Sequence, residues 1–126
     1  MTDSIRLKDG RAPRVFIAED EYLVALETET VLTQLGCEVL GPANTFKQAE
    51  TMARAEDFDA AIVDVNLRGV EIYPVADILA KRGIPFAFAT GFSAEGVAAA
   101  HRARPRLQKP FHDEQMREIL RVLLGV

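Results

Sequence analysis

Residues 58–64 read Phe58-Asp59-Ala60-Ala61-Ile62-Val63-Asp64, and this stretch decides the fold that the sequence predicts. Four consecutive apolar residues end in a carboxylate, and residues 65–69 then break the run. A short apolar run bounded by polar residues is typical of a strand buried on both faces of a parallel sheet. An ionised carboxylate beside a dry core is unfavourable unless a cation or hydrogen-bond donors meet it. Asp64 is therefore the candidate reactive centre, at the strand end where α/β sheets form ligand crevices.

The composition describes one ordinary globular domain. The 126 residues are 48% hydrophobic and 27% charged, with a formal net charge of -4. That length fits one compact domain with its own core, and the negative charge argues against nucleic acid as the main partner. The single cysteine, Cys37, cannot form an internal disulfide and is expected to be a small buried residue. The sequence holds no apolar segment of membrane-spanning length and no signal-peptide core, so we expect a cytoplasmic protein without a membrane partner.

Strand and helix patterns alternate along the rest of the chain. Residues 1–13 are expected to form a flexible N-terminal arm, and residues 14–126 the folded domain. Apolar or alternating runs predict four further strands, at 14–18, 37–40, 84–89 and 106–108. Helical periodicity and capping residues predict five helices, at about 22–35, 45–55, 74–83, 94–101 and from 113 to the end. Five βα units predict an α/β flavodoxin-like three-layer sandwich, with a five-stranded parallel sheet in the order 2-1-3-4-5 and five helices.

Polar side chains follow four of the predicted strands, at the point where each strand ends. These residues are Glu19, Asp20, Asp64, Thr90 and Lys109. Because the carboxyl ends of parallel strands meet at one edge of a sheet, we expect these side chains to share one crevice. Each residue alone has an ordinary explanation, such as an acidic helix start, a hydroxyl that satisfies backbone groups, or a solvated lysine. Their joint occurrence at four strand ends favours a functional site.

The chemistry of this group indicates phosphoryl transfer. Clustered carboxylates repel one another and need a cation, and their hard oxygen atoms suit Mg²⁺ or Mn²⁺. The metal and Lys109 would keep Asp64 ionised and able to act as a nucleophile. The same two cations and the Thr90 hydroxyl could hold the oxygens of a transferred phosphoryl group. The product would be an aspartyl phosphate.

The pattern resembles the response-regulator receiver domain of two-component signalling, over nearly the whole chain from Arg14. The signature of that family is an acidic pair after strand one, an Asp after strand three, a Thr or Ser after strand four, and a Lys-Pro pair after strand five. The resemblance implies that Asp64 accepts a phosphoryl group from a histidine kinase or phosphotransfer protein. It implies that Asp20, Asp64 and the backbone carbonyl of Asn66 bind Mg²⁺ and that Glu19 assists. It also implies a cis bond between Lys109 and Pro110.

Two features depart from the usual receiver pattern. Receivers carry an aromatic switch residue three positions before the lysine, where this chain has Arg106. Residues 85–92, Pro-Phe-Ala-Phe-Ala-Thr-Gly-Phe, look like the FAT GUY subclass of alphaproteobacterial receivers, although Ser93 replaces an expected aromatic residue. That subclass lacks the strand-five aromatic and is similar to partners of HWE or HisKA2-type kinases. The usual coupling between the threonine and a rotating ring is therefore in question here.

The sequence ends soon after the last predicted helix, so we expect output through the surface of the receiver itself. By the resemblance, that surface is formed by helix four, strand five and helix five, and it would bind a downstream protein. Residues 101–106, His-Arg-Ala-Arg-Pro-Arg, give it a basic edge. This edge is either a solvated loop or a docking patch for an acidic partner.

Two alternative functions remain open from the sequence. A haloacid-dehalogenase-type phosphatase also uses a strand-end Asp, Thr, Lys and Mg²⁺, but it needs a second acid where this chain has Asn66. A binding module that keeps the fold and signals without phosphorylation is the other alternative, which Arg106 leaves open. The intact acidic site favours the phosphorylated switch, a signalling domain and not an enzyme.

Overall fold

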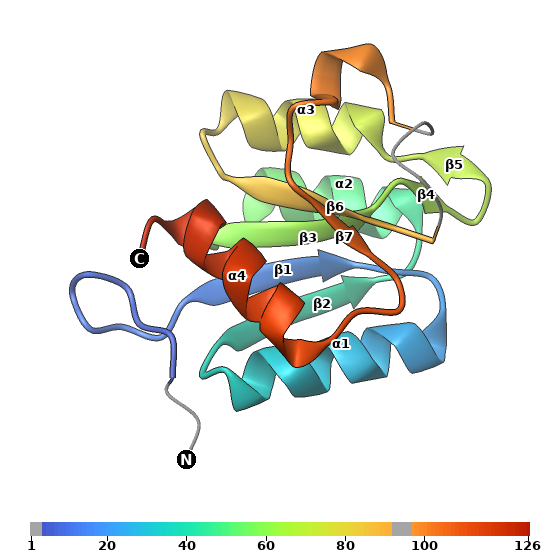
Figure 1. Cartoon of the computed structure of the whole chain (residues 1–126). Coiled ribbons are helices and arrows are strands. Elements are labelled where there is room, and N and C mark those ends of the chain that lie inside the picture. The colour runs from blue at the N-terminus through green and yellow to red at the C-terminus, as the bar shows by residue number, and fades with distance from the viewer. Residues whose placement is uncertain (1–3, 92–96) are drawn as a thin grey trace.

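The computed structural model describes residues 4–91 and 97–126, which form a three-layer α/β sandwich (Figure 1). A short 3₁₀ helix, η2 (Ala99–His101), precedes the last strand. The other elements, in chain order, are β1 (Arg14–Ala18), α1 (Tyr22–Gln34), β2 (Glu38–Ala43), α2 (Phe46–Ala55), β3 (Ala60–Asp64), β4 (Asn66–Leu67), β5 (Val70–Glu71), α3 (Tyr73–Lys81), β6 (Phe86–Thr90), β7 (Arg106–Gln108) and α4 (Asp113–Leu124).

The central sheet has five parallel strands in the order β2-β1-β3-β6-β7. This order confirms the predicted 2-1-3-4-5 arrangement. Helices α1 and α4 cover one face of the sheet, and α2 and α3 cover the other (Figure 1). Among the described residues, no helix is both long and apolar enough to cross a bilayer.

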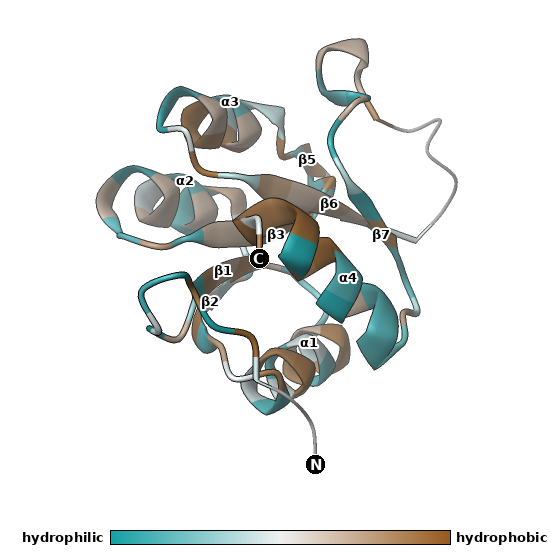
Figure 2. Cartoon of the chain, turned by 60° about the vertical axis from the view of Figure 1, so that its left-hand side comes forward, coloured by the Kyte–Doolittle hydropathy of each residue, from teal (hydrophilic) through white to brown (hydrophobic). Residues whose placement is uncertain are grey.

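Strand β3 is buried on both faces, as its sequence predicted. All five of its residues are buried. Ala61 and Val63 pack into the core beneath α2 and α3, whereas Ile62 packs into the core beneath α1 and α4. This alternation follows from the two-residue period of a strand. Figure 2 shows hydrophobic colour along the central strands and hydrophilic colour on connecting loops and outer helix surfaces.

The edge strand β2 bends where it passes the middle of β1. The register between the two strands shifts between Phe16 and Ala18. Gly41 lies in this stretch at φ +101°, a left-handed conformation that glycine adopts without strain. A Cβ atom at this position would lie 2.6 Å from the carbonyl oxygen of Ile17 and 2.9 Å from the amide nitrogen of Ala43. Glycine therefore permits a close approach that a side chain would block.

The predicted helix over residues 94–101 is the main difference from the expected fold. Residues 94–96 lie outside the described residues, and residues 97–101 contain the 3₁₀ helix η2. The described residues therefore hold four α-helices where five were expected. The Ala98 N–H donates to the Tyr73 hydroxyl at 2.8 Å, and the His101 ring is buried against α3. These contacts hold the segment in a tighter turn than an α-helix.

A small antiparallel hairpin, β4–β5, stands where the sequence predicted only a loop. Asn66 pairs with Glu71, and Leu67 pairs with Val70. Strands of two residues are too short to show a periodic pattern, so they could not be predicted from the sequence. Leu67 is fully buried and anchors the hairpin in the core.

The segment before β1 adds to the core beneath α1. Ile5, in the part expected to be a flexible arm, is 4% exposed, and its N–H donates to the Leu35 carbonyl at 2.7 Å. Cys37 lies in the same apolar group and is a free thiol, as the sequence predicted. Burial raises the pKa of this thiol to about 11. It is therefore protonated near neutral pH and behaves as a small apolar residue.

Candidate functional site

Four strands of the sheet bring polar side chains to one rim of the molecule. We call the five residues Glu19, Asp20, Asp64, Thr90 and Lys109 the strand-end site. Strand β1 ends just before the acidic pair, β3 and β6 end in Asp64 and Thr90, and β7 ends just before Lys109. These strands are direct neighbours in the parallel sheet, so their carboxyl ends lie side by side. The structure thus brings the sequence-predicted residues to one place.

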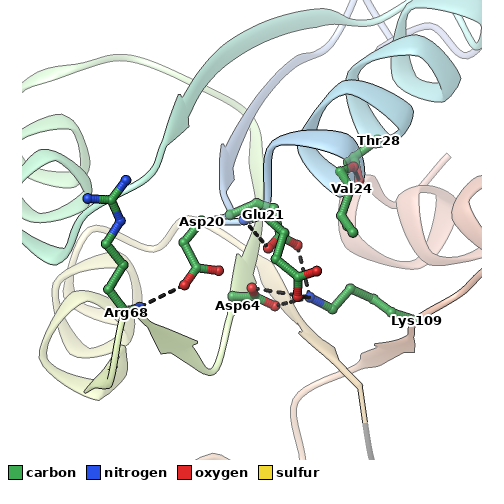
Figure 3. A network of polar contacts seen from close by, with 8 residues as sticks. Asp20, Glu21, Val24, Thr28, Asp64, Arg68 and Lys109 are labelled. Carbon is green, nitrogen blue, oxygen red and sulfur yellow. Dashed lines mark hydrogen bonds and ion pairs between the residues drawn. The ribbon is translucent and has the colours of Figure 1, made fainter.

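The Lys109 ammonium group lies among the carboxylates of this site (Figure 3). Its Nζ is 3.0 Å from Oε1 of Glu19 and 3.0 Å from Oδ1 of Asp64, with Oδ2 of Asp64 at 3.2 Å. Oε1 of Glu21 is 4.0 Å away. The side chains of Glu19 and Asp64 are nearly buried. One ammonium therefore faces two buried carboxylates and a third at the surface, which leaves the group with excess negative charge.

Burial and this excess of charge together shift the pKa values of the site. Burial raises the pKa of Asp64 to about 8, and Glu19 adds to the rise through its hydrogen bond and its charge. Lys109 opposes the rise, but it does not cancel it. Burial alone would lower the pKa of Lys109, yet its contacts with Glu19 and Asp64 outweigh burial and raise it. A further cation beside Asp64 would favour the ionised carboxylate.

The donor atoms at the site fit a hard divalent cation. One carboxylate oxygen from each of Glu19, Asp20 and Glu21 lies within 4.8 Å of the other two. Oxygen-only donors suit Mg²⁺ or Mn²⁺. The raised pKa of Asp64 also indicates a shortage of positive charge, so the residues present fit such an ion.

Backbone contacts fix the acidic pair that follows β1. The N–H of Glu19 donates to the carbonyl of Ala43 at 2.9 Å, and the N–H of Glu21 donates to Oε2 of Glu19 at 3.1 Å. Oδ2 of Asp20 accepts from the main-chain N–H of Arg68 at 2.8 Å. The two acids are therefore oriented by different neighbours, β2 on one side and the β4–β5 hairpin on the other.

Asn66, a predicted metal ligand through its carbonyl, follows Asp64 at the start of β4. Its side-chain Oδ1 accepts from the N–H of Gly69 at 2.7 Å, so the amide is engaged inside the hairpin.

Thr90 and Lys109 are joined by the backbone at the other side of the site. The Lys109 N–H donates to the Thr90 carbonyl at 2.7 Å, so the end of β6 is tied to the loop after β7. The Lys109–Pro110 peptide bond is cis, as the resemblance implied.

Within the basic stretch 101–106, Arg102 is exposed and Arg104 and Arg106 are half-buried, whereas His101 departs from the predicted edge. His101 is buried, and its ring is stacked on Tyr73 with centroids 5.8 Å apart. Its Nε2 lies 3.0 Å from Oδ1 of Asp77 and donates, because a carboxylate can only accept. Arg106, at the position where receivers carry an aromatic residue, donates to the Arg102 carbonyl at 2.7 Å. His101 is therefore not part of the basic edge, because its ring fits among aromatic rings from α3 and β6.

Two contributors to the site were not predicted. Glu21 directly follows the predicted acidic pair, and its place in the acidic triplet is the signal that could have identified it. The main-chain N–H of Arg68 has no signal in the sequence, because any residue except proline carries one.

Comparisons with known proteins agree with the predicted family. A family model described as "Response regulator receiver domain" matches residues 15–121. The solution structure of SdrG from Sphingomonas melonis Fr1 is similar, with a TM-score of 0.81 and 41% identity, over 91% of this chain and 98% of that chain. A solution structure of the BeF3-activated conformation of SdrG, given as from Pseudomonas melonis Fr1, matches with a TM-score of 0.76 and 44% identity, over 88% of this chain and 95% of that chain.

A longer curated relative also matches. The transcriptional regulatory protein PdtaR of Mycobacterium tuberculosis is 33% identical in an alignment of 116 residues, and the match covers 88% of this chain and 57% of PdtaR. The chain therefore spans little more than half the length of this relative.

Proposed function

The chain belongs to the response-regulator receiver domain family, and we propose that it accepts a phosphoryl group on Asp64 from a histidine kinase or phosphotransfer protein. The observation that carries the proposal is the position of the Lys109 ammonium, 3.0 Å from both Asp64 and Glu19 on the rim that also bears Thr90. A nucleophilic carboxylate beside a fixed cation and a hydroxyl is the set of groups that phosphoryl transfer to an aspartate needs.

The proposed step is an in-line displacement at phosphorus. A carboxylate oxygen of Asp64 attacks, an O–P bond forms, and the bond between phosphorus and the donor nitrogen breaks. The departing imidazole keeps the electron pair of that bond and takes a proton from solvent. The Lys109 ammonium pairs with one phosphoryl oxygen, and the Thr90 hydroxyl donates a hydrogen bond to another.

A divalent cation belongs to this proposal. Asp20, Asp64 and the main-chain carbonyl of Asn66 would hold Mg²⁺, or Mn²⁺ in its place, and Glu19 would assist. When bound, the ion supplies positive charge against the oxygens of the transferred group. The raised pKa of Asp64 supports this assignment, because the protein alone does not supply enough positive charge to ionise the nucleophile fully near neutral pH.

The domain is proposed to act as a signalling switch whose partners are proteins. The resemblance of residues 85–92 to the FAT GUY subclass favours a kinase of the HWE or HisKA2 type, although residue 92 lies outside the described residues. Output to a downstream protein is proposed through the surface around β7 and α4. A cytoplasmic location is also proposed, and the single cysteine supports it.

Phosphorylation from a small donor tests the proposal directly. Incubation of the protein with Mg²⁺ and phosphoramidate should add one acid-labile phosphoryl group per chain, measured by intact mass. Beryllofluoride should shift amide resonances around Asp64, in keeping with the BeF3-activated conformation solved for the related SdrG.

Two matched variants make the test specific. Asp64→Asn should abolish the uptake. Asp57→Asn, a change of the same chemistry at an exposed acid just before β3, should leave it intact. Equal uptake by the Asp64→Asn variant, or no uptake by wild type, would refute the proposal.

A further inference from the structure

The tip of the β4–β5 hairpin contacts the strand-end site through its backbone. Residues Arg68 and Gly69 form the two-residue turn of the hairpin, with φ values of 50° and 87°. Arg68 is the only non-glycine residue with positive φ in the described ranges 4–91 and 97–126. Its main-chain N–H donates to Oδ2 of Asp20 at 2.8 Å, while its guanidinium points away from the site (Figure 3).

We propose that this hairpin is a positioning device for Asp20, in which the Arg68 N–H holds one carboxylate oxygen and the Asn66 side chain holds the turn. The inference rests on the proposed function, because it assigns Asp20 a divalent cation to bind. Arg68 and the side chain of Asn66 therefore have a positioning role, separate from the proposed metal contact of the Asn66 carbonyl, and neither side chain is proposed to contact the phosphoryl group.

The electrostatics of the acidic triplet explain why Asp20 needs to be held. Its carboxylate lies within 4.8 Å of carboxylate oxygens from Glu19 and Glu21, and like charges at this distance repel. Glu19 is held by Lys109 at 3.0 Å, whereas the described ion pairs include none for Asp20. A backbone N–H is a fixed donor that can oppose the repulsion without competing for the cation.

The hairpin is itself tied to the core, so its tip is a firm support. Leu67 is fully buried, and Ile72, also fully buried, donates its N–H to the Val65 carbonyl at 2.8 Å. Between these anchors, Oδ1 of Asn66 accepts from the N–H of Gly69 at 2.7 Å. The turn is therefore fixed at both ends and across its middle, and the Arg68 N–H is fixed with it.

A pair of variants at Arg68 isolates the backbone from the side chain. Arg68→Gly and Arg68→Val both remove the guanidinium and both keep the N–H. Glycine adopts φ near +50° readily, whereas a β-branched residue strongly disfavours it. We expect the Mg²⁺ affinity of Arg68→Gly to lie within about twofold of wild type and that of Arg68→Val to be about tenfold lower. A tenfold loss is the lower end of the range seen when a residue that supports a metal ligand is removed.

Amide chemical shifts in a Mg²⁺ titration give the dissociation constants directly. Asn66→Ala, which removes the acceptor for the Gly69 N–H, should also weaken Mg²⁺ binding. The rate of phosphorylation by phosphoramidate adds a second readout. For Arg68→Val, the Mg²⁺ concentration that gives half the maximal rate should rise about tenfold, while the rate at saturating Mg²⁺ should stay near that of wild type.

Each outcome separates this inference from the proposed function. If wild type neither binds Mg²⁺ nor takes up phosphate, the proposed function fails. If wild type does both and the two Arg68 variants bind Mg²⁺ equally, the positioning role alone fails. If Arg68→Val and Arg68→Gly have similar urea denaturation midpoints, the weaker Mg²⁺ binding of Arg68→Val is a local effect, which supports the inference. If Arg68→Val loses Mg²⁺ affinity because the whole domain unfolds, the inference is overturned.

Discussion

Lys109 and His101 each make a contact of 3.0 Å with a carboxylate, yet the two regions have different properties. Lys109 faces two nearly buried acids and a surface acid, so its surroundings keep a negative charge. His101 meets one acid, Asp77, whose side chain is 67% exposed, and otherwise packs on aromatic rings. The Lys109 region is thus short of positive charge and suited to bind a cation. The His101 region has no such shortage, and it holds the segment around η2 against α3.

The largest effect is expected from Lys109→Met, which removes the ammonium from the reacting groups. The rate of phosphorylation by phosphoramidate should fall about 10²–10³-fold, as when a fixed charge-stabilising donor is lost from an active site. Mg²⁺ should still bind, because the acidic ligands remain. A variant that keeps the wild-type rate would show that Lys109 only balances the charge of Glu19 and Asp64.

His101→Ala should instead affect stability and leave the chemistry intact. Removing a buried ring from among Tyr73, Phe86 and Phe88 leaves a cavity, and we expect a loss of about 2–3 kcal/mol in the free energy of unfolding. Urea denaturation measures this loss. The phosphorylation rate of the folded variant at saturating Mg²⁺ should lie within a few-fold of the wild-type rate. A strong loss of rate would show that the two regions are functionally coupled.

The free energy of unfolding should depend on pH because of Asp64, which belongs to the Lys109 region and not to the His101 region. The pKa of Asp64 is about 8 in the folded protein and near 4 in the unfolded chain. Between pH 4 and pH 8 the folded state therefore binds a proton on Asp64 that the unfolded state does not bind. Stability without a divalent cation should therefore fall as pH rises from 5 to 8, by on the order of 2 kcal/mol. Asp64→Asn should flatten this part of the profile, and Mg²⁺ should reduce the loss in wild type. An identical pH profile for the variant would refute the assignment.

The smallest effect is expected from Asp77→Asn. A hydrogen bond to an exposed carboxylate contributes about 0.5 kcal/mol, and the amide oxygen of asparagine can still accept from Nε2 of His101. The free energy of unfolding should therefore change far less than in His101→Ala. A loss as large as that of His101→Ala would mean that the hydrogen bond to Asp77, and not the aromatic packing, holds the segment.

The strand-end site could be predicted because it follows from regular elements. The apolar run before Asp64 specified a doubly buried strand, and the rule that parallel strands end at one edge brought Thr90 and Lys109 to it. This reasoning needs only the identity of the residues at, or just after, the end of each strand. It does not depend on side-chain rotamers or loop geometry.

The remaining features depend on packing that a linear pattern does not show. His101 lies in a run of basic residues that is typical of an exposed loop, and only the assembled fold reveals the aromatic rings from α3 and β6 that surround it. The hairpin around Arg68 is too short for a period, and its contact with Asp20 uses a backbone group. Both features come from contacts between segments distant in the sequence.

Gly41 has a consequence for a residue that it does not touch. Any side chain there would push the edge strand outward, because its first carbon atom would meet the Ile17 carbonyl oxygen at 2.6 Å. The same strand carries Ala43, whose carbonyl receives the Glu19 N–H at 2.9 Å. A scan of every position for loss of phosphate uptake should therefore find a sensitive site at Gly41, remote from the chemistry, where tolerance is governed by the room between two neighbouring backbones.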